Sequence, residues 1–182
     1  MSSHWNPGIP YFHLPGSHSI NFRLNGIYPV FFEHYFGSTY YFIDVQNWRF
    51  IFLDTSKTYL PLTQRRWLRY RLKECKQEGK RAVIFTHCPP MAAEQGIAHS
   101  LTQGSTDALA RIVSDYDVAA IFAAHIHKTF NYVWNEIPVH VVALNDATWT
   151  DNQPAEYLNV SVSKGQIEVK SVKIFKTSKR RL

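Results

Sequence analysis

The middle of the chain alternates between two hydrophobic patterns. Continuous apolar runs at residues 81–87 and 118–124 are typical of strands that are covered on both faces. The segments at 62–80 and about 105–116 instead carry apolar residues at helical spacing. Thr63 and Ser105 are candidate N-caps of these helices. Strands and helices that alternate in this way predict a sheet with helices packed on it.

Strand-like runs dominate the two flanking regions. Residues 39–45 and 48–55 are β-rich and are separated by Gln-Asn, which predicts a hairpin. Residues 9–14 predict another strand, which runs into a turn containing glycine. Four further runs follow in the last third of the chain, at 130–134, 138–144, 157–162 and 166–175. We therefore expect a mixed α/β (α+β) fold, a layered β-sandwich flanked by helices.

The composition is that of an ordinary globular protein, and it limits the classes of partner to be expected. A length of 182 residues with 45% hydrophobic and 19% charged residues suits one domain. We expect this domain at residues 1–175, followed by a basic tail at 176–182 that supplies four of the six net positive charges. The sequence has no recognisable helix-turn-helix, zinc finger or RNA-binding motif, so we do not expect a nucleic-acid partner.

The lengths of the apolar runs and the number of cysteines indicate the cellular location. The sequence contains no apolar stretch long enough for a membrane span and no visible secretory signal. Only Cys75 and Cys88 occur, and one pair cannot make a disulfide framework, so we expect free thiols. These features predict a cytoplasmic protein without a membrane partner.

Histidines follow several of the predicted strands. His125 and His127 end the run at 118–124, and they would project from one face if the extended backbone continued through them. A cation that binds both as neutral ligands would remove their mutual repulsion. His87 ends the other buried run, and His18 follows the first predicted strand. Each could singly be a surface or core-edge histidine, but together they favour a metal site at the strand ends.

The order of these motifs resembles the calcineurin-like metallophosphoesterases. The likeness rests on the strand followed by "GSHS", the hairpin ending in "FLDT", the helix "QRRWLRYRL", and the strands ending in "FTHCPP" and "AHIH". It runs from about residue 9 to the final hairpin. In the family, the corresponding motifs are Gly-Asn-His-Asp or Glu, His followed by prolines, and Gly-His-x-His.

The resemblance implies an activity and a set of roles. His87 and His125 would bind one metal ion and His127 the other, while His18 would act near the leaving oxygen as a proton donor or transition-state stabiliser. The chemistry would be hydrolysis of a phosphoester, with a phosphodiester among the candidate substrates. The family's divalent metals, Mn, Fe, Zn or Co, cannot be distinguished by ligand type.

Departures from the family pattern concern the metal ligands. Ser17 stands where the family has a metal-binding Asn, Ser19 replaces an acid, and Ala124 replaces a Gly. The family's upstream Asp-x-His and Gly-Asp motifs have no counterpart, because residues 1–32 contain no Asp or Glu. Bridging carboxylates hold two cations close together, so the dinuclear site is incomplete in this sequence.

Three hypotheses for function follow. The first is an N-terminally truncated metallophosphoesterase with impaired or no activity alone. The second is a non-catalytic binding or scaffold relative of the family, and the third is a mononuclear site formed by His87, His125 and His127. In the family the upstream motifs lie on two strands, and the lack of these strands would leave apolar edges, so self-association or a partner chain could complete the sheet. We set aside Cys88 as a ligand or nucleophile because no ordered partner is evident.

Overall fold

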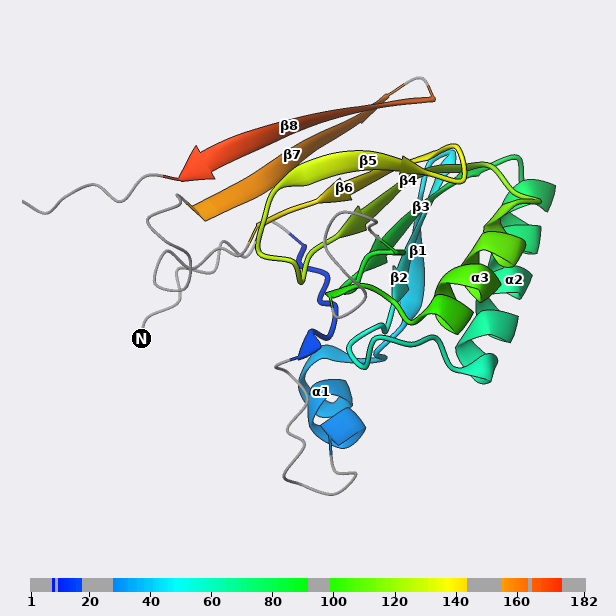
Figure 1. Cartoon of the computed structure of the whole chain (residues 1–182). Helices are drawn as coiled ribbons and strands as arrows, with labels where there is room; N and C mark the ends of the chain where they lie inside the picture. The colour runs from blue at the N-terminus through cyan, green and yellow to red at the C-terminus, as the bar shows by residue number, and fades with distance from the viewer. Residues whose placement is uncertain are drawn as a thin grey trace, which may run out of the picture.

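The computed structural model describes residues 8, 10–17, 28–91, 99–143, 155–163 and 165–174, apart from the side chains of 28–31 and 155. In this part of the chain, a mixed six-stranded sheet carries two helices on one face (Figure 1). A separate two-stranded sheet lies over the opposite face. The predicted arrangement of a multistranded sheet flanked by helices is therefore confirmed.

The strands of the main sheet are ordered β1-β2-β3-β4-β6-β5. The β1–β2 and β5–β6 pairs are antiparallel, whereas β2, β3, β4 and β6 pair in parallel. Their bounds are β1 Tyr41–Val45, β2 Trp48–Leu53, β3 Arg81–Thr86, β4 Val118–Ala123, β5 Phe130–Trp134 and β6 Ile137–Val141. The predicted hairpin at 39–55 and both buried strands are confirmed.

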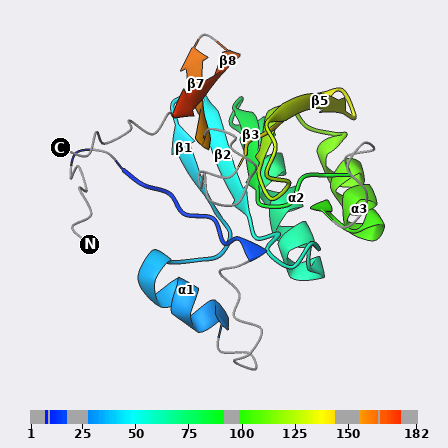
Figure 2. The same ribbon diagram turned by 60° about the vertical axis from the view of Figure 1, so that its left-hand side comes forward.

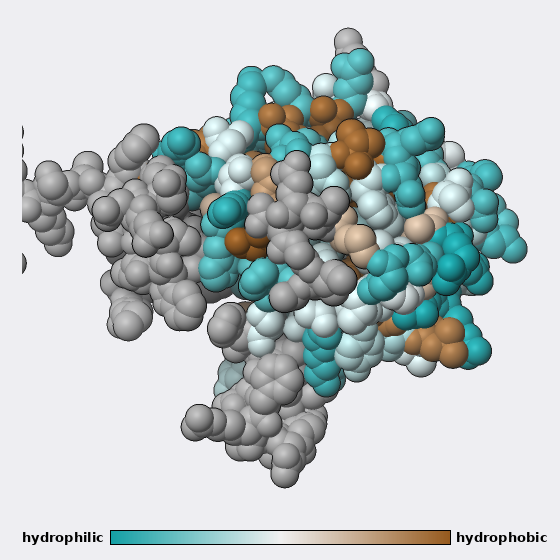
Figure 3. Space-filling view, viewed as in Figure 1, coloured by the Kyte–Doolittle hydropathy of each residue, from teal (hydrophilic) through white to brown (hydrophobic). Residues whose placement is uncertain are grey.

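Two helices, α2 (Leu62–Gln77) and α3 (Gln103–Val113), cover one face of this sheet. Leu68 and Leu72 of α2 and Leu109 of α3 are almost fully buried. They pack with the side chains on the helix-facing side of β3 and β4. Figure 3 shows that the described outer surface in that view is mostly hydrophilic, with hydrophobic residues in small separate patches.

The other face of the sheet packs against β7 (Ala155–Ser163) and β8 (Gln166–Ile174). These strands form an antiparallel hairpin that crosses above the sheet (Figure 2). Alternate residues of the hairpin contact Trp48, Val83 and Phe122 of the sheet, because successive side chains of a strand point to opposite faces. The hairpin residues that make these contacts are Leu158, Val160, Val162, Ile167 and Val169.

An aromatic row crosses the main sheet on the hairpin side. The rings of neighbouring strands stack with centroids 4.6–5.3 Å apart and interplanar angles of 10–21°. Each pair is also a register pair of adjacent strands. The row consists of Tyr41, Phe52, Phe85, Phe122 and His140. Burial lowers the pKa of His140, because the charged imidazolium would lose water there.

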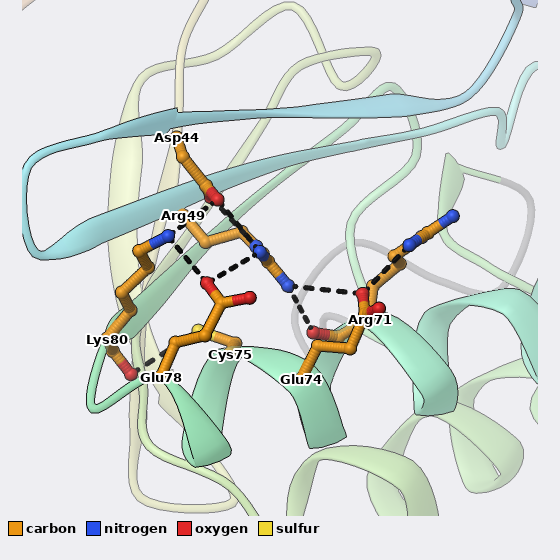
Figure 4. A network of polar contacts seen from close by, with 7 residues as sticks. All are labelled: Asp44, Arg49, Arg71, Glu74, Cys75, Glu78 and Lys80. Atoms are coloured by element: carbon orange, nitrogen blue, oxygen red, sulfur yellow. Dashed lines mark hydrogen bonds and ion pairs between the residues drawn. The ribbon is translucent and has the colours of Figure 1, made fainter.

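A buried arginine ties the first hairpin to α2 (Figure 4). The Arg49 side chain is 3% exposed and donates two hydrogen bonds of 2.8 Å to the Asp44 carboxylate. It also forms ion pairs of 3.5 Å with Glu74 and 3.1 Å with Glu78 at the end of α2. The Arg49 hydrogen bonds lower the pKa of Asp44 to about 2. This network joins β1, β2 and α2, and the residues drawn in Figure 4 include no histidine.

Some local predictions are wrong. Residues 10–14 form no strand. This segment lies beside β1, where the Tyr41 hydroxyl donates a hydrogen bond of 2.8 Å to the carbonyl of His13. Thr63 and Ser105 lie inside their helices, since α2 begins after Pro61 and α3 after Thr102. The Ser105 hydroxyl instead accepts a hydrogen bond from the backbone of Leu60. Helix α1 (Tyr28–Phe36), which was not predicted, lies apart from the helical layer.

Candidate metal site

Two predicted histidines meet at one edge of the main sheet. His87 follows the end of β3, and His125 lies two residues beyond the end of β4. Because β3 and β4 are parallel neighbours, their carboxyl ends lie at the same edge (Figure 1). The two imidazole ring centroids are 4.5 Å apart. The two histidines predicted at the strand ends therefore lie side by side.

The backbone around His125 differs from the predicted strand. Strand β4 ends at Ala123, and His125 and His127 have φ angles of 70° and 60°. Both residues are therefore left-handed, a conformation that carries a cost for residues other than glycine. Hydrogen bonds from Ala124 to the His87 carbonyl, at 3.1 Å, and from Ile126 to the Ala124 carbonyl, at 2.8 Å, fix this turn. The two histidines consequently do not project by strand alternation.

Thr55 anchors the loop that carries His87. This residue is fully buried after β2, and its Oγ1 accepts hydrogen bonds of 2.9 Å from the backbone amides of both His87 and Cys88. The neighbouring Asp54 accepts hydrogen bonds from the amide and hydroxyl of Ser56. Asp54 thus braces the loop after β2. The Thr55 hydrogen bonds hold the loops after β2 and β3 together without the help of a ligand.

The predicted motif at residues 16–19 is described in part. Ser17 Oγ lies 3.1 Å from Nε2 of His87. Gly16 lies directly against the same ring, since a Cβ built there would be 3.3 Å from His87 Cε1. His18 and Ser19 lie outside the described residues. The structure therefore brings the start of this motif to His87 and leaves the proposed role of His18 as a prediction.

Three donor groups gather at this edge. The potential ligand atoms of His87, Cys88 and His125 all lie within 4.8 Å of one another. Cys88 is fully buried, and burial raises the pKa of its thiol to about 12. His127 is not a member of this group, so the proposed cluster of three histidines is not the one that forms. Both cysteines are free thiols, as expected.

Sequence reasoning missed two side chains that lie close to His87 and His125. Cys88 was set aside, and its place directly after His87 is the one sequence signal of this proximity. His99 is exposed, and its ring packs edge-on against His125 with centroids 5.8 Å apart. His99 belongs to the loop between β3 and α3, of which residues 92–98 are not described. No periodic pattern in that loop marks it as a neighbour of His125.

The donor set can be tested against a dinuclear metal centre. Two adjacent divalent cations need bridging carboxylates to offset their repulsion. Within the described ranges, no Asp or Glu belongs to the cluster of His87, Cys88 and His125. These residues therefore do not fit a carboxylate-bridged pair of ions. Two imidazoles and a thiol are suitable donors for a single transition-metal ion.

The fold is of the metallophosphoesterase type. The structure is similar to that of a dimetal phosphatase from Danio rerio, with a TM-score of 0.64 over 88% of this chain and 68% of that one. The sequence identity of that pair is 14%, so this likeness concerns the fold.

A relative is also found by sequence. The chain is 27% identical over 155 residues to the protein named "Probable glycerophosphodiester phosphodiesterase GpdQ" from Arcobacter nitrofigilis. The match covers 75% of this chain and 55% of that relative, so the chain spans about half the length of the protein it matches. No protein-family profile matches the chain. The relationship to metallophosphoesterases suggested by the motifs is supported by the sequence relative and the shared fold.

No helix in the described ranges is both long and apolar enough to cross a bilayer.

Proposed function

We propose that the chain is a metal-dependent phosphoester hydrolase whose metal site is built on His87 and His125. The observation that carries this proposal is the 4.5 Å separation of the two rings at the ends of adjacent parallel strands. The sequence relative named as a phosphodiesterase supports a phosphoester as the substrate. A divalent cation bound there would polarise a phosphoryl oxygen and activate water for attack on phosphorus.

The side chains at this edge of the sheet would have different roles in the reaction. His87 and His125 offer neutral imidazole lone pairs to the cation, and the Thr55 hydrogen bonds hold the His87 backbone in position. His18 remains the proposed proton donor to the leaving oxygen. His127 would bind a second cation only where carboxylates are supplied from outside the described residues. Ser17 is a degenerate ligand position, and its contact with His87 suits an orienting role.

The described residues of the cluster at His87, Cys88 and His125 include no acidic ligand, and this limits the expected activity. Without bridging carboxylates, a second cation would be held poorly, so we expect the chain alone to hydrolyse phosphoesters weakly. The same observation favours a second candidate function, a non-catalytic relative that binds a metal ion or a phosphorylated ligand. Turnover measurements distinguish the two.

The test is hydrolysis of an aryl phosphodiester by the metal-loaded chain. We expect slow turnover that a chelator abolishes and that His125→Ala lowers at least about tenfold. His34→Ala is the matched control, because His34 is an exposed histidine on α1 and should leave the rate unchanged. Turnover that survives chelation or His125→Ala would refute the proposal. Complete inactivity with intact metal binding would favour the non-catalytic alternative.

A further inference from the structure

The donors at the sheet edge differ from those of a carboxylate-rich centre. We infer that His87, Cys88 and His125 form a mononuclear, thiolate-containing site that selects Zn²⁺ or another soft divalent cation. This inference rests on the proposed metal site, but it does not require the chain to be catalytic. It assigns Cys88 as a metal ligand, which the sequence pattern did not.

Geometry is the first argument. In a tetrahedral zinc site with bonds of about 2.0–2.3 Å, neighbouring donor atoms lie about 3.5 Å apart. The three donors here all lie within 4.8 Å of one another, so each pair needs to close by at most about 1.3 Å. Side-chain torsions of the two histidines and of Cys88 would supply this adjustment when a cation binds.

The backbone around the donors is already fixed. Thr55 Oγ1 holds the amides of His87 and Cys88 at 2.9 Å, and the His87 carbonyl accepts the amide of Ala124. His125 follows in a left-handed conformation, with φ of 70°. Strained backbone conformations persist where the surrounding structure determines them, and they are common at ligand sites. These backbone hydrogen bonds therefore hold the segments that carry the three donors close together.

The chemistry of the donors determines the kind of cation. Carboxylate and water oxygens suit Mg²⁺ and Mn²⁺, whereas thiolate and imidazole favour Zn²⁺, Co²⁺ and softer ions. As the metal–sulfur bond forms, the S–H bond of Cys88 breaks and its proton passes to solvent. Two neutral imidazoles and one thiolate leave a bound divalent cation with a net positive charge. Three protein ligands also leave a fourth position for water or an anionic oxygen.

The test is cobalt binding followed by absorption spectroscopy on the full chain. A cobalt–thiolate bond gives an intense near-ultraviolet charge-transfer band, which imidazole and carboxylate ligands do not give. We expect this band with the wild-type chain, at one Co²⁺ per chain, and we expect Zn²⁺ to displace the cobalt while Mg²⁺ does not. This readout needs no enzymatic activity and no variant.

Two cysteine variants then locate the sulfur ligand. Cys88→Ser should abolish the band and weaken zinc binding at least about tenfold in a chelator competition. Cys75→Ser is the matched control, because Cys75 is also buried but its Sγ contacts the carbonyl of Lys80 at 3.3 Å, in the helical layer. It should retain both the band and the affinity. Thermal melts without metal would report whether each variant folds.

Each outcome separates this inference from the proposed function. Binding of cobalt without the thiolate band, or a band that survives in Cys88→Ser, would overturn the assignment of Cys88. Two ions per chain without the band would indicate a centre of the dinuclear kind instead. A full band without phosphoester turnover would support the metal site and refute the hydrolase.

Discussion

Gly16 lies so close to the His87 ring that the size of its side chain matters. It follows Pro15, and its Cα faces the His87 ring so closely that an added Cβ would lie 3.3 Å from Cε1 and 3.4 Å from Nδ1. The first distance is tighter than ordinary van der Waals contact, and the second lies at its lower limit. Glycine therefore suits this close approach of backbone to imidazole. The sequence shows a glycine at the start of the motif at 16–19, but it does not show that the glycine lies against His87.

Gly16→Ala should weaken metal binding without unfolding the chain. The added methyl group pushes the His87 ring away from its position, so we expect zinc affinity to fall several-fold. Gly104→Ala is the control, because a Cβ there meets no atom within 4 Å and alanine is a better helix former in α3. We expect the control to keep its affinity. Equal zinc affinities of the two variants in a chelator competition would contradict this role of Gly16.

At the scale of elements, the site depends on the loops that follow parallel strands. Strands β2, β3 and β4 pair in order, so the segments after Leu53, Thr86 and Ala123 begin at the same edge. Thr55 links the first two segments through one hydroxyl, and the Ala124 amide links the second to the third. Paired backbone groups matter because a buried amide without an acceptor is costly.

Thr55→Val should therefore destabilise both the fold and the site. Valine keeps the shape of threonine but leaves the buried amides of His87 and Cys88 without their acceptor. We expect a loss of about 2–4 kcal/mol in the free energy of unfolding, measured in urea, together with weaker metal binding. Thr55→Ser retains the hydroxyl and should lose at most about 1 kcal/mol. A valine variant as stable as the serine variant would show that the two hydrogen bonds are not needed.

The whole molecule is held together by two different packing layers. The helices bury aliphatic side chains on one face of the main sheet, whereas β7 and β8 cover aromatic and aliphatic residues on the other. In the described ranges, the hairpin pairs only with itself and contacts the sheet through side chains. Its position over the sheet consequently depends on its apolar face.

Val160→Asp should release the hairpin from the sheet. Val160 packs against the buried cluster that contains Val83 and Phe122, so a carboxylate there loses solvation without gaining a partner. We expect about 1–3 kcal/mol of destabilisation and faster amide exchange in β7 and β8 than in β3 and β4. Asn159→Asp is the control, because Asn159 is exposed and pairs with Lys170 across the hairpin. Equal exchange in both variants would argue against this packing.

Element order and strand-end histidines were predictable because they depend on local patterns. The continuous apolar runs at β3 and β4 and the helical spacing of Leu68 and Leu72 carry their own periodicity. Chain segments 10–14 and 28–36 were predicted less well. The apolar run at 10–14 lacks a ladder partner in the described ranges, and α1 contains mainly aromatic residues without a clear helical stripe.

The sequence by itself determined which side chains stand at the ends of the buried strands, because a strand of known direction carries its last residue to one edge. It determined likewise that this chain carries no acidic residue before Glu33. Only the tertiary structure decided which donors meet. The left-handed turns at His125 and His127 are visible only in the structure, and the Thr55 hydrogen bonds and the proximity of Cys88 to His125 join segments that are distant in the sequence. Such contacts depend on packing, which no local periodicity records.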